Sequence, residues 1–259
     1  MSPAIPSWLG VLSSLALVGI CLFVVVREQL GLTREVLVAA SRAAGQLVAV
    51  GALLGVLFRH TGLLGSLLWV SAMVLVGGRV AGRRGGGLPR AYVVATLAIG
   101  AGVVATLGLL LLARVVQVEP RVVVPVGGMV VAAATRGTSV VMLRLREEAV
   151  AGRRFIEARL ALGLAGGQAF APHRRLALST ALITDLDQVR TVGLISLPGA
   201  MTGLLLAGVA PLTAIRYQIV VMYMLLGAVA VAGTVAARLA TGLLFDDAER
   251  LIELAEPAR

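Results

Sequence analysis

The sequence predicts an all-α polytopic membrane protein with about seven transmembrane helices. Of its 259 residues, 59% are hydrophobic and only 14% are charged, and the mean hydropathy is +0.97. A soluble domain cannot hide that much apolar surface. Seven apolar runs of about 18 to 27 residues recur along the chain, a length that spans a hydrocarbon core of roughly 30 Å as a helix.

The runs follow one another closely except at one long polar interval. We predict spans at residues 8–26, 36–58, 63–80, 91–113, 121–143, 191–210 and 214–240. No basic residue precedes the first run and no cleavage motif follows it, so we expect a span there rather than a signal peptide. The chain then divides into helices 1–5 at 1–143, a helical arm at 144–190, helices 6–7 at 191–240 and a tail at 241–259.

The arginines indicate the orientation in the membrane. The net charge is +10, and all 23 basic residues are arginine. With the N-terminus outside, seventeen arginines fall on the inner side, four fall outside and two lie within spans. The positive-inside rule therefore favours an N-out/C-in topology, with the arm and the tail in the cytoplasm. The arginines lie between apolar blocks, so they predict topology and membrane lipid contact rather than a nucleic-acid partner.

The polar interval 144–190 is the predicted coupling arm. Its sequence indicates one helix to about Leu162, a break at Gly163–Gly167 and a second helix from about Pro172. Such an arm could dock the end of a short inner helix into a groove on a partner. A solvated charged helix would have the same composition, so both interpretations stand.

The stretch 191–218 is apolar but contains many helix breakers, namely Gly193, Pro198, Gly199, Gly203, Gly208 and Pro211. Pro198 removes a backbone donor, so the helix should kink or unwind there. Gly199 and Gly203 should let another helix approach closely. Broken backbone at membrane depth is tolerated only against protein or a water-filled cavity, so we expect a packed element that lines a pore.

Polar and sulfur side chains inside the spans are candidates for a transport path. Arg42 and Gln46 share one helical face, where they could line the path, although Arg42 could also reach the headgroups. Met129, Met201 and Met222 could contact a soft metal in transit or simply pack.

Soluble catalytic chemistry is not indicated. The sequence has no Walker A loop, HExxH, CxxC or GxSxG, a single cysteine (Cys21) and two histidines far apart. We therefore expect no enzyme activity in this chain and no cofactor, and the metal ligands stay unknown. If ATP drives the protein, another chain must bind it.

Two motifs carry a resemblance to known transporters. The string EARLALG at 157–163 resembles the EAA loop of ATP-binding-cassette permeases, with Glu157, Ala158 and Gly163 matching and Arg159 departing. The block from Thr191 to Leu226 resembles the FetB/YbbM family of iron-export permeases, which has plant aluminium-tolerance permeases as relatives. Upstream, the strings around Arg42 and Gln46 and from Pro125 to Met129 resemble other recurring positions of this family.

The resemblance implies the permease subunit of an ATP-binding-cassette exporter in the bacterial cytoplasmic (inner) membrane. Two copies would work with two separate ATPase subunits, which would dock at Glu157, Ala158 and Gly163 of the arm. The transport path would comprise Arg42, Gln46, Met129, Pro198, Met201, Gln218 and Met222. Iron as substrate rests on the resemblance, since an organic anion or a nucleotide sugar would suit Arg42 equally well.

The alternative function is a self-contained secondary transporter or channel for a small anion or metal. Ion-coupled carriers usually carry acidic residues at membrane depth. All Asp and Glu residues here fall outside the seven runs, which counts against this alternative.

Overall fold

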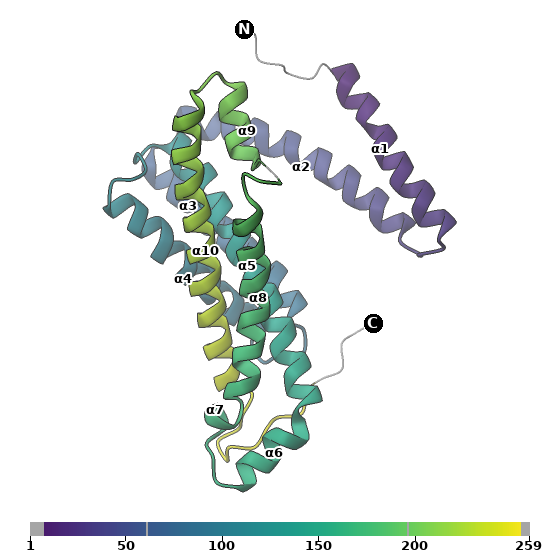
Figure 1. Ribbon diagram of the computed structural model, residues 1–259, viewed down its shortest axis with the longest axis vertical. Coiled ribbons are helices and arrows are strands. Elements are labelled where there is room, and N and C mark those ends of the chain that lie inside the picture. The colour runs from purple at the N-terminus through teal and green to yellow at the C-terminus, as the bar shows by residue number, and fades with distance from the viewer. Residues whose placement is uncertain (1–7, 61, 196, 255–259) are drawn as a thin grey trace. The chain divides into compact units, whose positions relative to one another are not determined.

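The computed structural model describes residues 8–60, 62–195 and 197–254, and the regular secondary structure in this part of the chain is helical (Figure 1). An isolated antiparallel bridge joins Phe245 to Leu251. The chain divides into two compact units, residues 1–61 with 206–209 and residues 62–205 with 210–259.

The first unit contains a helical hairpin of α1 (Trp8–Arg27) and α2 (Thr33–His60). Gly31 lies in the turn at φ +70°, a left-handed conformation that glycine adopts without a steric penalty. Val25 is buried, but most described side chains of both helices are exposed and apolar. Exposed apolar surface of this extent suits contact with lipid or with other helices in a membrane.

The second unit is built on four long helices, α3 (Leu63–Arg84), α4 (Ala91–Leu112), α5 (Pro120–Ala151) and α10 (Pro211–Gly242). Helices α3 and α10 each pack against both α4 and α5. The core between them is apolar, and Ile99, Val130 and Met142 are completely buried there. The α3–α4 contact is very close, because a Cβ atom on Gly82 would lie 2.9 Å from Cα of Tyr92.

Four further helices are described between α5 and α10. The short helices α6 (Arg153–Ala161) and α7 (Gly166–Ala169) lie at one end of the unit, and α8 (Ala171–Thr191) returns from there and packs against α5 and α10 (Figure 1). The eight-residue helix α9 (Gly199–Leu206) precedes α10.

Six of the seven predicted spans are confirmed as helices that are long and apolar enough to cross a membrane, namely α1 to α5 and α10. The sixth predicted span, 191–210, is not one continuous helix. Helix α8 ends at Thr191, and regular helix resumes only at Gly199 as α9. The breakers account for this, since Pro198 immediately precedes α9 and Gly193 and Gly208 adopt φ values of +80° and +84°.

The prediction of a close helix approach at Gly199 and Gly203 is wrong for the described part of this chain. Nothing there lies within 4 Å of a Cβ atom built on either glycine. No residue of α9 is fully buried either, so the expected tight packing of this stretch is absent from the described residues. The close approaches occur instead in α3, at Gly78 and Gly82.

The arm also differs from the single helix predicted over 144–162. Helix α5 continues to Ala151, and Gly152 separates it from α6. The reason is a tertiary contact that the sequence pattern does not show, because a Cβ atom on Gly152 would lie 3.0 Å from Nε2 of His173. The predicted break at Gly163–Gly167 is confirmed between α6 and α8, with Gly163 at φ +86°.

Candidate functional site

The candidate site is the arm formed by α6, α7 and the loop between them. Helix α6 is short and amphipathic, with Ile156 completely buried against the core and Phe155 73% exposed. Leu162, just after the helix, is 80% exposed. Two large apolar side chains that project from a polar segment are typical of a surface that a partner covers.

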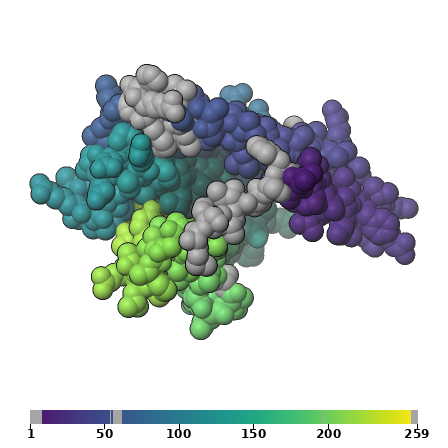
Figure 2. All heavy atoms as spheres, turned by 90° about the horizontal axis from the view of Figure 1, so that it is seen from above, coloured from purple at the N-terminus to yellow at the C-terminus, as the bar shows by residue number. Residues whose placement is uncertain are grey.

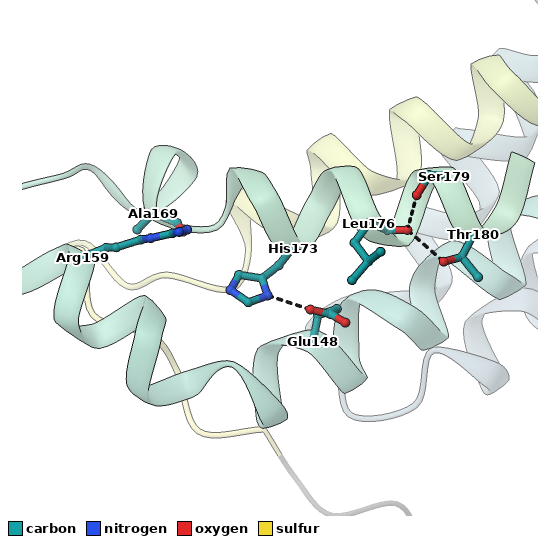
Figure 3. Close-up of polar contacts among 7 residues, drawn as sticks. All are labelled: Glu148, Arg159, Ala169, His173, Leu176, Ser179 and Thr180. Atoms are coloured by element: carbon teal, nitrogen blue, oxygen red, sulfur yellow. Dashed lines mark hydrogen bonds and ion pairs between the residues drawn. The ribbon is translucent and has the colours of Figure 1, made fainter.

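Specific polar contacts hold this arm in place (Figure 3). Nδ1 of His173 at the start of α8 is hydrogen-bonded to Oε2 of Glu148 near the end of α5, at 2.7 Å. Phe170 stacks on the His173 ring with 5.6 Å between the ring centroids. Nη1 of Arg159 donates to the carbonyl oxygen of Ala169 at 3.1 Å, which ties α6 to α7. The arm is therefore a braced element rather than a loose loop.

The three predicted coupling residues lie together on this arm. Glu157, Ala158 and Gly163 are all exposed, and Oε1 of Glu157 accepts a hydrogen bond from Nε of Arg153 at 2.7 Å. Arg159, which departs from the EAA pattern, is the residue that contacts Ala169. Arg159 thus helps to hold the arm in place.

The seven predicted path residues are distributed over α2, α5, α9 and α10, with Pro198 directly before α9. Arg42 and Gln46 are exposed on α2, in the first unit. Met129 on α5 is half-buried, and Gln218 and Met222 on α10 are buried. Pro198 and Met201 are half-buried at the start of α9.

Gln218 is the path candidate with the clearest physical signal. Its side chain is 5% exposed, and its Oε1 atom is buried without a hydrogen-bond partner among the described residues. A buried acceptor without a donor is costly, so such atoms usually serve a ligand or an ordered water.

A cavity of about 430 Å³ is lined by Tyr217 and Val221, which are close to Gln218 in the sequence. Residues of α5 and of the α4–α5 connection complete its lining. Figure 2 looks onto this end, where the α4–α5 connection (teal) lies beside the start of α10 (yellow-green).

Sequence reasoning missed a charge pair between α5 and α8. The Glu148–His173 contact sets the register of these two helices, and Arg136 and Asp185 each lie twelve residues further along, about 18 Å at 1.5 Å per residue. Burial raises the pKa of Asp185, and the Arg136 guanidinium partly offsets that rise.

The field of Arg136 on α5, a candidate spanning helix, therefore reaches Asp185. Asp185 itself lies on α8, which is not one of the candidate spans. Arg136 and Asp185 are equally far from the Glu148–His173 contact along two antiparallel helices, and this spacing is the signal that could have found the pair. The contact itself is not visible in the sequence. In the described part of the chain, no three His, Cys, Asp or Glu side chains lie close enough together to hold a metal ion.

These features define the class of the protein as a multi-pass α-helical membrane protein with a braced polar arm between two of its long helices. Residues 8–245 match the sequence profile described as "Uncharacterised protein family (UPF0014)". The chain belongs to this family.

Three relatives cover most of the chain. It is 42% identical to the "UPF0014 membrane protein STAR2" of Oryza sativa subsp. japonica, over 86% of this chain and 79% of the relative. It is 38% identical to the "Protein ALUMINUM SENSITIVE 3" of Arabidopsis thaliana, over 86% and 82%. It is 30% identical to the "Probable iron export permease protein FetB" of Escherichia coli K12, over 92% of both chains. No solved structure matches.

Proposed function

We propose that this chain is the permease subunit of an ATP-binding-cassette exporter that moves iron or another metal out of the cell. Three things support this proposal: the six described helices suited to a membrane, the family membership, and the similarity over 92% of the chain to the Escherichia coli relative named a probable iron export permease. ATP hydrolysis would take place on a separate ATPase subunit.

The observation that carries the proposal is the braced arm with its exposed Phe155 and Leu162. Motion at an ATPase can reach the membrane only through an element that is rigid and fastened to the spanning helices. The Glu148–His173 contact fastens the arm to α5, and α8 continues from it to the broken stretch before α9. Movement of the arm would thus reach the irregular backbone around Pro198 and alternate the access of the path.

The proposed setting is the bacterial cytoplasmic membrane, with the N-terminus outside and the arm and tail inside. The arginine distribution supports this orientation. Two copies of the chain with two ATPase subunits would form the transporter, because an exporter needs a path enclosed on all sides.

The substrate is proposed to contact Gln218 first. An amide oxygen is a hard ligand of the kind that suits iron as Fe(III) better than a thioether does. Its buried, unpartnered Oε1 is available for a cation that has shed part of its hydration shell. Met222, one turn further along the helix, would line the same path.

The test is binding of a co-expressed ATP-binding subunit to the detergent-solubilised chain. We expect Phe155→Asp combined with Leu162→Asp to weaken binding at least about tenfold, because two exposed apolar anchors of an interface would be lost. Leu112→Asp is the matched control, since Leu112 is 86% exposed at the opposite end of the unit, and it should leave binding unchanged. Equal binding by all three proteins would contradict the proposal.

A second candidate is a self-contained secondary transporter or channel for a small anion or metal. The half-buried Asp185, whose pKa is raised by burial, favours it, because ion-coupled carriers use ionisable residues near membrane depth. Gradient-driven transport by the purified chain without any ATPase would support this candidate.

A further inference from the structure

The segment after α10, residues 243–254 and here called the tail loop, is a folded element. Leu244 and Leu251 are buried in the core, and the backbone N–H of Ile252 donates to the carbonyl oxygen of Leu244 at 2.9 Å. The N–H of Asp246 donates to the carbonyl oxygen of Arg250 at 3.0 Å. The tail loop therefore doubles back on itself in a defined conformation.

The Asp246 carboxylate holds the turn of the tail loop. It accepts hydrogen bonds from the backbone N–H groups of Ala248 at 3.0 Å and Arg250 at 2.8 Å, and from Nε of Arg250 at 2.9 Å. These donors lower the pKa of Asp246, and the backbone N–H of Arg250 contributes most. The carboxylate is thus fully committed to the loop itself.

Two contacts fasten the tail loop to the arm. A carboxylate oxygen of Glu249 accepts a hydrogen bond from the backbone N–H of Gly166 at the start of α7. The Phe245 ring meets Phe170 edge-on, with 6.4 Å between the ring centroids. Since Phe170 also stacks on His173, an unbroken chain of contacts links the tail loop to α8 and, through Glu148, to α5.

The tail loop and the arm enclose an open groove of about 990 Å³. One wall is α6 with Arg153, Glu157 and Leu160, the floor includes Gly163, and the tail loop supplies the other wall. Two of the three predicted coupling residues, Glu157 and Gly163, therefore line it.

The groove carries a net negative charge on an otherwise basic molecule. Its two guanidinium groups are already paired, Arg153 with Glu157 at 2.7 Å and Arg250 with Asp246 at 2.8 Å. The remaining charged groups that line it are the carboxylates of Glu249 and the exposed Glu253. The whole chain has a net charge of +10, so this acidic groove would favour a basic occupant.

We propose that the tail loop forms half of the docking surface for the ATPase subunit, and that the groove receives a basic segment of that subunit. This inference rests on the proposed function and adds a second element and a charge preference to it. An anionic lipid headgroup or a nucleic acid would be repelled by the same carboxylates. The exposed Phe155 and Leu162 would then supply apolar anchors beside a charged groove, the usual division of a protein interface into core and rim.

The test reverses one charge on the groove wall. Glu253→Arg changes an exposed lining residue, and Asp247→Arg makes the same charge change at an exposed tail-loop residue outside the lining. We expect Glu253→Arg to weaken binding of the co-expressed ATPase subunit about fivefold or more at low salt, and less at high salt, because attraction becomes repulsion. Asp247→Arg should change binding less than twofold, and both variants should elute and melt as the wild type does.

The outcomes separate this inference from the proposed function. If the wild type binds the ATPase subunit and the Phe155/Leu162 double variant does not, while Glu253→Arg and Asp247→Arg bind alike, the proposed function stands and the role of the tail loop is refuted. If the wild type itself binds no ATPase subunit, both fall. A loss specific to Glu253→Arg that salt suppresses supports the docking groove.

Discussion

At the scale of single residues, the Arg136–Asp185 pair is the most informative feature of the molecule. Asp185 is half-buried, and burial raises its pKa against the opposing field of Arg136. Arg136 is exposed, so solvent screens the attraction between the two side chains. The pair should therefore contribute modestly to the attachment of α8 to α5.

The first prediction concerns exchange of these two charges. Arg136→Asp alone and Asp185→Arg alone should each lower the melting temperature of the detergent-solubilised protein, since each turns the attraction between the two positions into repulsion. The double variant should recover part of that loss, with a coupling free energy of about 0.2–1 kcal/mol, the range for a solvent-exposed charge pair. Thermal unfolding of the four proteins measures this, and strictly additive losses would show that the two side chains do not interact.

The second prediction concerns Asp246 and pH. Its pKa is lowered in the folded protein, so its contribution to stability is fully present above the ordinary Asp pKa of about 3.9 and is lost as the pH falls through the lowered value. Hydrogen exchange at Ala248 and Arg250 should be slow at pH 6 to 7. Asp246→Asn should speed exchange at both amides at neutral pH, whereas unchanged exchange would show that the carboxylate does not hold the turn.

At the scale of elements, the glycines of α3 set how closely the helices pack. A Cβ atom on Gly78 would lie 2.9 Å from Cα of Thr96 on α4, closer than real Cβ atoms approach backbone. The two helices can make this contact only where α3 has no side chain. The sequence alone would not show which of the apolar, glycine-containing helices pack this closely.

The third prediction follows from this contact. Gly78→Leu should push α3 away from α4 and destabilise the second unit by about 1–3 kcal/mol or more, because the obstacle is backbone rather than a flexible side chain. Gly108→Leu is the control, since nothing lies within 4 Å of a Cβ atom there. The yield of monodisperse protein after heating compares the two, and similar yields would contradict the packing described here.

The long apolar helices were predictable from the sequence, whereas helix breaks that depend on tertiary contacts were not. The ends of α4 and α10 lie within three residues of the predicted spans because hydropathy alone sets them. The break at Gly152 depends on the His173 ring, which is 21 residues away in the sequence. Likewise Pro198 predicted an interruption of the helix. The length of that interruption depends also on Gly193, which adopts φ +80°.

The candidate site was predictable in part for the same reason. The position of the coupling residues followed from a local motif and from Gly163 as a breaker. The contacts that brace the arm join residues far apart in the chain, such as Glu249 with Gly166. No periodicity or composition reports such a contact, so only the structure shows that the tail loop is fastened to the arm.

At the scale of the whole molecule, long apolar helices and a polar arm fastened to them divide the work of transport. In the proposed function the spanning helices would carry the path, and the buried Oε1 atom of Gln218 would be its first ligand. We propose that a partner ATPase acts on the arm and the tail loop and supplies the driving force. This division of labour is the central claim of the proposed function.

The most direct test is ATP-dependent metal transport in proteoliposomes that contain this chain with its ATPase subunit. We expect ATP to drive accumulation of iron in vesicles whose arm faces outward, and we expect the Phe155→Asp/Leu162→Asp variant to abolish it while Leu112→Asp does not. Accumulation that requires an ion gradient, and proceeds equally without ATP or the ATPase subunit, would contradict the claim.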